Sequence, residues 1–144
     1  QWSKSDVIKN ANIVQKKFTG ENLGKFLLLM FGDNPQEWSQ NLSDDEKSQY
    51  TINALMRIRF CKRNGELEFK HKNIEQPPQG YLPWFMHKNR QMSNQKIFFG
   101  HWSTLKDTNI KNTYALDHGC VWGGRLAAYN LTLQELISQD SIEY

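Results

Sequence analysis

The stretch IFFGHWSTLKDTNIKNTYALDHGCVWGGR occupies residues Ile97–Arg125 and decides how the chain is organised. It contains two short apolar runs, Ile97–Phe99 and Tyr114–Leu116, and each run ends at a polar or glycine-containing corner. Buried strands end in this way, and side chains just past a strand end often carry function. We therefore predict two strands, with His101 at the first corner and Asp117 at the second.

His101 follows Gly100 and precedes Trp102, which places it directly after the first predicted strand. A histidine in such a position suits a metal ligand or a general acid, although a histidine that only packs in a loop is the more common outcome. The sequence contains no HxH, HExxH or paired CxxC motif that would supply further metal ligands. On the residues alone, the corner is a candidate site without an assigned reaction.

The composition fits one domain or part of one, with 144 residues, 38% of them hydrophobic, and a net charge of +3. Lysine and arginine are scattered along the chain, apart from the pairs Lys16-Lys17 and Lys62-Arg63. A surface that binds duplex nucleic acid needs a denser basic patch. The charge pattern therefore predicts no specific nucleic-acid partner and permits a modest anionic ligand.

Cys61 and Cys120 form no spaced metal-binding set. A single pair in a chain of this size favours reduced thiols, and it leaves one disulfide open as an alternative. No apolar run approaches the ~20 residues that a membrane span needs, and the sequence shows no signal peptide. We therefore expect a cytoplasmic protein without a membrane partner.

Apolar residues at helical spacing predict three helices in residues 1–56. The first runs from Ser3 or Ser5 to Phe18, the second from Asn22 to Phe31, and the third begins at a capping box that opens with Ser43. The side chains expected to lie inward are Val7, Ala11, Val14 and Phe18, then Leu23, Phe26, Leu27 and Met30, then Tyr50, Ile52, Leu55 and Met56.

Over Arg57–Phe60 polar and apolar residues alternate, which is the pattern of a strand. Asn64-Gly65 is a typical hairpin turn, and Leu67–Phe69 is the expected partner strand. On such a strand, Arg57 and Arg59 would share one face. That face is either solvated or presents a pair of guanidinium groups to a phosphate, since the planar guanidinium binds oxyanions through two hydrogen bonds.

Near the C-terminus, Leu126–Tyr129 reads as a strand, residues 130–133 as a turn, and Gln134–Ser138 as the return strand, with a helix from Thr132 as the alternative. Helices come first and strands follow. The sequence therefore predicts an α/β or α+β fold, in which one sheet has helices on one side.

Several short motifs occur in a fixed order along the chain: MRIRFC over Met56–Cys61, PWF over Pro83–Phe85, FGHW over Phe99–Trp102, YALD over Tyr114–Asp117 and WGG over Trp122–Gly124. Together they resemble the C-terminal half of the bacterial symmetrical bis(5′-nucleosyl)-tetraphosphatases, which are diadenosine tetraphosphate hydrolases of the metallophosphoesterase superfamily. The resemblance covers nearly all 144 residues.

The resemblance implies that residues 1–144 are one C-terminal segment of a calcineurin-like phosphoesterase domain. Residues 1–56 would be mostly helical, and residues 57–144 would form strands and loops of a β-sandwich flanked by helices. The implied reaction is the symmetrical cleavage of diadenosine tetraphosphate into two ADP. Two divalent ions, manganese or cobalt, would activate a water for in-line attack on phosphorus and neutralise developing charge.

The resemblance also assigns roles to individual residues. His101 would be a metal ligand and catalytic, and Arg57 would be catalytic and contact the polyphosphate. The further residues expected on the substrate side are Arg59, Asn53, Trp102 and Asp117, with Trp84 as an alternative ring beside the nucleotide.

Two departures from the family pattern limit what this chain alone is expected to do. The earlier metal-binding motifs of the family are absent, so the chain is expected to be a fragment whose partner is the N-terminal half of the same domain, and to be inactive or weakly active by itself. His118 stands where a threonine is expected. Another metallophosphoesterase, such as a protein phosphatase, and a non-catalytic nucleotide-binding module are the alternative functions.

Overall fold

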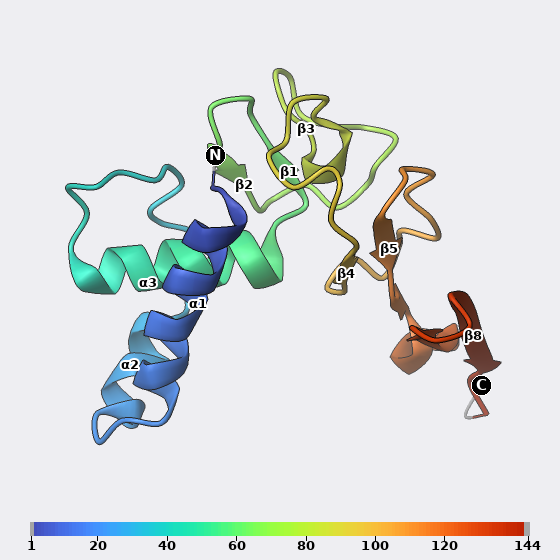
Figure 1. Cartoon of the computed structure of the whole chain (residues 1–144), viewed down its shortest axis with the longest axis horizontal. Helices are drawn as coiled ribbons and strands as arrows, with labels where there is room; N and C mark the ends of the chain where they lie inside the picture. Colours follow the sequence, from blue (N-terminus) through green and yellow to red (C-terminus); the bar gives the residue numbers. More distant parts are fainter. Residues whose placement is uncertain (1, 143–144) are drawn as a thin grey trace.

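The computed structural model describes residues 2–142 and has a mixed α/β fold, with helices first and strands after them (Figure 1). The helices are α1 (Lys4–Phe18), α2 (Leu23–Leu29) and α3 (Asp44–Ile52), and α3 continues into the π-helical turn η1 (Asn53–Arg57). Ser3 and Ser43 cap α1 and α3 with complete capping boxes, as predicted. The predicted fold class is confirmed.

The three helices pack around Val14, Phe26 and Ile52, and the half-buried Phe18 and Met30 cover this cluster. The inward face predicted for α1 is therefore confirmed. In α2 the prediction is only half right, because Leu23 and Leu27 lie on the exposed side. In α3 and η1, the predicted inward residues Tyr50 and Ile52 are buried, whereas Leu55 and Met56 are exposed.

The strand predicted over Arg57–Phe60 is wrong. Helical structure continues to Arg57, Arg59 lies in a bend, and β1 covers only Phe60–Cys61. Four alternating residues are a weak strand signal, and the helix-favouring Ala-Leu-Met run before them extends the helix instead. Arg57 and Arg59 consequently do not share one strand face.

The strands form three small sheets instead of the single predicted sheet. In the first, β1 lies between β2 (Leu67–Glu68) and β3 (Leu82–Pro83), and the predicted turn at Asn64-Gly65 joins β1 to β2. A short 3-10 turn, η2 (Trp84–Met86), follows β3.

The second sheet pairs β4 (Ile97–Phe99) with β5 (Thr113–Ala115) in parallel. The third contains β6 (Asp117–His118), β7 (Arg125–Asn130) and β8 (Glu135–Asp140), with the 3-10 turn η3 (Cys120–Trp122) between β6 and β7. The return strand near the C-terminus is confirmed, and the alternative helix from Thr132 is not formed. Figure 1 shows this third sheet at the opposite end of the molecule from α2.

Two aromatic clusters hold the central part together. The first contains Phe60, Phe85, Trp102, Leu105 and Ala115, and the second contains Tyr50, Cys61, Leu67 and Phe69. Cys61 and Cys120 are both free thiols. Within residues 2–142, no helix combines the length and apolar character that crossing a membrane requires.

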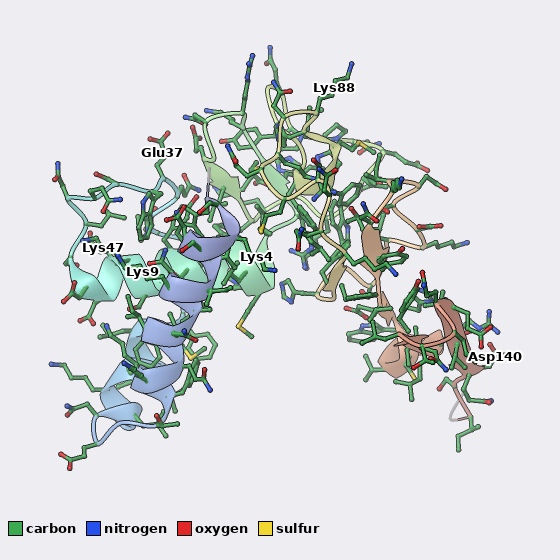
Figure 2. The ribbon with its side chains drawn as sticks, viewed as in Figure 1. Lys4, Lys9, Glu37, Lys47, Lys88 and Asp140 are labelled. Atoms are coloured by element: carbon green, nitrogen blue, oxygen red, sulfur yellow. The ribbon has the colours of Figure 1, made fainter. Side chains whose placement is uncertain are left out.

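The lysines labelled in Figure 2 lie on separate parts of the molecule: Lys4 and Lys9 on α1, Lys47 on α3 and Lys88 above the first sheet. They do not gather into one stripe.

Candidate functional site

The parallel pairing of β4 and β5 brings the two predicted corners together. Phe99 is the register partner of Ala115, and the backbone N–H of Leu116 donates to the carbonyl oxygen of Phe99 at 2.8 Å. A Cβ atom placed on Gly100 would lie 3.6 Å from the Cβ atom of Asp117. The corner that carries His101 is therefore adjacent to the corner that carries Asp117.

His101 has a backbone conformation that non-glycine residues adopt infrequently. Its φ angle is 63°, in the left-handed region, and its side chain is exposed. Histidine tolerates this region better than most residues, but it still costs conformational energy. Backbone strain of this kind is concentrated at functional sites, so the conformation supports the choice of this residue as a candidate.

The electrostatic surroundings of His101 favour its neutral form. Partial burial of the imidazole lowers its pKa below 6.5, and the positive charges of Arg59 and Arg57 lower it further. The carboxylate of Asp117 opposes this shift but does not cancel it. The ring is therefore neutral at pH 7, which is the protonation state that a metal ligand requires.

Arg57 is held in place by three hydrogen bonds from its guanidinium group. One nitrogen donates to the carbonyl oxygen of Gly32 and to Oδ1 of Asn53, both at 2.8 Å, and the other donates to Oδ1 of Asp33 at 2.9 Å. The guanidinium also lies over the ring of Phe69, 4.8 Å from its centroid. About a third of the side chain, 32%, remains exposed, so Arg57 is oriented and still accessible.

Asn53 does not fit its predicted role as a substrate contact. Its side chain is completely buried, its Nδ2 donates to the carbonyl oxygen of Gly32 at 3.0 Å, and its Oδ1 accepts from Arg57. The sequence analysis placed Asn53 within the third helix but on the substrate side, whereas the helix directs its side chain inward. Asn53 is a positioning residue for Arg57.

Arg59 carries an unused hydrogen-bond donor. Its Nε atom is the one buried side-chain nitrogen or oxygen within residues 2–142 that has no hydrogen-bond partner. Burial and the neighbouring charge of Arg57 lower the pKa of Arg59, whereas Asp117 and Glu68 act in the opposite direction. A buried donor without a partner costs free energy.

Glu68 is a charged residue of this region that the sequence reasoning missed. Its buried carboxylate accepts from the backbone N–H groups of Lys70 at 2.9 Å and His71 at 3.1 Å, and it lies 3.0 Å from Nδ1 of His71. Burial raises its pKa, and the contacts with His71 and Lys70 outweigh this effect, so the pKa lies below its ordinary value. The available signal was an acidic residue between two apolar ones in a predicted strand.

The prediction that Trp102 contacts substrate does not fit the structure. Only 2% of Trp102 is exposed, its indole N–H donates to the carbonyl oxygen of Lys72 at 2.7 Å, and its ring packs edge-to-face against Phe60 with centroids 5.0 Å apart. Trp84, the alternative, packs against Phe85 and Phe99. The ring of Trp102 is therefore closed to a nucleotide, whereas Trp84 is half-buried and lines a surface pocket with Trp2, Trp38 and Tyr50.

The second corner is ordered by short-range contacts. Oδ1 of Asp117 accepts from the backbone N–H of Gly119 at 3.2 Å, and Nε2 of His118 lies 3.1 Å from the carbonyl oxygen of Ala115. The ring of His118 is thus engaged with the backbone of β5. This contact gives His118 a local structural role.

The residues that the structure describes do not by themselves fit a pair of divalent ions. Among residues 2–142, no group of three or more histidine, cysteine, aspartate or glutamate side chains lies close enough together to hold a metal ion. Each ion of a binuclear centre needs several donors. His101 can supply one.

Comparison with known proteins gives relatives over nearly the whole chain. The chain is 38% identical over 133 residues to a protein of Janthinobacterium sp. (strain Marseille) named "Bis(5'-nucleosyl)-tetraphosphatase, symmetrical", covering 92% of this chain and 48% of that protein. A protein of the same name from Ralstonia nicotianae is also 38% identical over 133 residues, covering 92% of this chain and 47% of that protein. A third, from Wigglesworthia glossinidia brevipalpis, is 39% identical, covering 89% of this chain and 49% of that protein.

The chain spans about half the length of the curated relatives that it matches. No family model matches it. The similarity confirms the resemblance that the ordered motifs indicated.

Proposed function

Because the chain is similar over almost its whole length to symmetrical bis(5′-nucleosyl)-tetraphosphatases, we propose that it is part of a hydrolase that splits diadenosine tetraphosphate into two ADP. The observation that carries the proposal is the guanidinium group of Arg57, which three hydrogen bonds hold in place while about a third of the side chain stays exposed. The positive charges of Arg59 and Arg57 both lower the pKa of His101, so the corner is cationic. A polyphosphate is a suitable ligand for such a corner, since guanidinium groups recognise phosphate oxygens in bidentate geometry.

Arg57 and Arg59 would bind the polyphosphate in different ways. Arg57 is already oriented by Gly32, Asn53 and Asp33, so it would meet a phosphate oxygen with little loss of conformational entropy. Arg59 is half-buried, so the solvent-accessible part of its guanidinium group would bind a second phosphate oxygen. Asp117 would act by orienting the adjacent corner, because its Oδ1 accepts from Gly119.

His101 is proposed as one donor to the metal pair, with its neutral imidazole exposed at the first corner. When bound, two manganese or cobalt ions would supply Lewis-acid activation of water and neutralisation of phosphate charge. The other donors would come from an N-terminal half, and the complete β-sandwich would require that half as well. The 144-residue chain alone is therefore proposed to be inactive or weakly active.

The test is an assay in which the protein is incubated with diadenosine tetraphosphate and manganese. Ion-exchange chromatography then separates the released ADP from the substrate. We expect robust turnover by the complete protein, formed by joining this chain to an upstream half, and little or none by the 144-residue chain. Turnover by the short chain alone would contradict the incomplete metal site. Failure of the complete protein to release ADP would contradict the assignment itself.

A non-catalytic nucleotide-binding module is the second candidate, and the oriented, accessible guanidinium group of Arg57 favours it. This candidate predicts tight binding of ADP by the chain in the presence of EDTA, measured by calorimetry.

A protein-phosphatase-like activity is less well supported, because the relatives are named for a dinucleotide substrate. A panel that compares a phosphopeptide with diadenosine tetraphosphate separates these activities. The cytoplasmic location stays a prediction, to be checked by fractionation.

A further inference from the structure

The turn η3 is fixed by glycine residues on both sides. Gly119 and Gly123 have φ angles of 71° and 80°, which a side chain would strain. The carbonyl oxygen of Gly119 accepts from the N–H groups of Trp122 at 2.8 Å and Gly124 at 3.0 Å, and Gly123 donates to Cys120 at 3.1 Å. Three backbone hydrogen bonds within six residues make η3 a rigid turn.

Gly124 packs the end of this turn directly against β6. A Cβ atom at this position would lie 2.2 Å from the carbonyl oxygen of His118 and 2.9 Å from that of Gly119. Only glycine permits such an approach between two backbone segments. The turn is therefore held against the sheet as well as closed on itself.

The rigid turn holds an apolar surface in solvent. Trp122 is 76% exposed, and its neighbour Val121 is 72% exposed. Tryptophan is usually largely buried because of its apolar area, and the other four tryptophans of this chain are buried or half-buried. A large exposed ring on a turn with little conformational freedom is a preorganised contact surface.

The turn lies next to the candidate site. A Cβ atom on Gly119 would be 3.7 Å from Cβ of Ser103 and 3.9 Å from Cδ1 of Trp122, so Gly119 lies between the two side chains. Ser103 is two residues beyond His101 in the chain, and Asp117 accepts from the N–H of Gly119. Trp122 thus lies on the turn that follows the Asp117 corner, and that corner adjoins the one that carries His101.

We propose that Trp122 is a substrate-contact residue whose indole ring stacks on one purine base of the dinucleotide while the polyphosphate lies on Arg57 and Arg59. This inference rests on the proposed function and adds a specificity-determining residue to it. A dinucleoside polyphosphate combines a strongly anionic bridge with planar bases, and the corner and the turn offer one surface for each. A base can stack on an aromatic side chain whatever its identity, because every base has a flat π-face.

The test uses the complete protein and the variants Trp122→Ala and Trp122→Phe. We expect Trp122→Ala to raise KM for diadenosine tetraphosphate by about tenfold and Trp122→Phe to raise it by about threefold, since a smaller ring retains part of the stacking. The inhibition constant of inorganic tripolyphosphate, which has no base, should stay unchanged in both variants. Leu28→Ala, which removes an 83% exposed side chain from α2, is the matched control and should change neither constant.

The thermal unfolding midpoint distinguishes stacking from packing. An unchanged midpoint in Trp122→Ala, together with the selective rise in KM, supports the inference. Equal weakening of dinucleotide and tripolyphosphate binding, or a clear fall in the midpoint, would show that the ring packs against another part of the protein and would overturn it. An unchanged KM would overturn it while leaving the proposed function intact. Absence of ADP release by the unsubstituted protein would instead reject the proposed function, and the stacking role with it.

Discussion

Arg57 donates to Oδ1 of Asn53 at 2.8 Å, and Asn53 in turn donates from Nδ2 to the carbonyl oxygen of Gly32 at 3.0 Å. The fully buried amide thus ties the exposed arginine to the loop that follows α2. The interaction depends on η1, because the helical continuation of α3 places residues four apart on the same side. A surface arginine gains its orientation from a residue that never reaches solvent.

Replacement of Asn53 by alanine should weaken both the fold and the orientation of Arg57. The variant leaves the carbonyl oxygen of Gly32 with one donor fewer, and removes an acceptor of Arg57, at a cost of about 1–3 kcal/mol. Urea unfolding monitored by circular dichroism measures this change. Asn41→Ala in the exposed loop before α3 is the control and should lie within about 0.5 kcal/mol of the unsubstituted chain. Equal stability of the two variants would show that the buried amide contributes nothing.

Substitutions of His101 should separate its backbone conformation from its chemistry. Glycine and asparagine tolerate the φ angle of 63° and should keep the stability of the chain within about 1 kcal/mol. Valine, which is branched at Cβ, should destabilise the chain by more than about 1 kcal/mol. All three variants should abolish ADP release by the complete protein if the imidazole is a metal ligand. Full activity in His101→Asn or His101→Gly would refute that role.

The stability of the chain should fall with acid partly through Glu68. The folded state lowers the pKa of this carboxyl below its ordinary value of 4.5, so its contribution is fully present above that value. It is lost as the pH falls through the lower folded pKa, because the unfolded chain then binds the proton more readily. The difference in unfolding free energy between the unsubstituted chain and Glu68→Gln should therefore be largest above pH 4.5 and shrink in more acidic buffer. A difference that does not change between neutral and strongly acidic buffer would contradict this assignment.

Two glycine-to-alanine substitutions should have opposite effects. Gly124→Ala places Cβ 2.2 Å from a backbone oxygen and should destabilise the chain by about 1–3 kcal/mol. Gly24→Ala, in α2, meets no atom within 4 Å and should stabilise the chain by up to about 1 kcal/mol, because alanine favours helix. Differential scanning calorimetry of both variants measures the contrast. Equal shifts would mean that the turn relaxes around the added methyl group.

Local signals predicted much of the secondary structure. The capping boxes at Ser3 and Ser43 mark the starts of α1 and α3, and β4 lies where the apolar run over Ile97–Phe99 placed it. These features depend on residues within one or two turns of each other, so the chain itself specifies them. The error at Arg57 arose where a four-residue alternation competed with a continuing helix, and local patterns do not resolve that competition.

Long-range packing decided the candidate site. Trp102 directly follows His101 in the sequence, yet it is buried against Phe60. Trp102 and Phe60 meet because two segments that are far apart in the sequence pack together. The same packing left Trp122 exposed.

The sequence by itself determined the helix starts, the hairpin turn at Asn64-Gly65 and the ordered motifs that identify the relatives. Only the tertiary structure decided that the buried side chain of Asn53 orients Arg57, and that the corners of His101 and Asp117 adjoin. The physical reason is the separation along the chain between the groups that interact. Caps and turns are stabilised by groups a few residues apart, whereas β4 and β5 meet across a loop, and their pairing depends on the whole core that holds them in register.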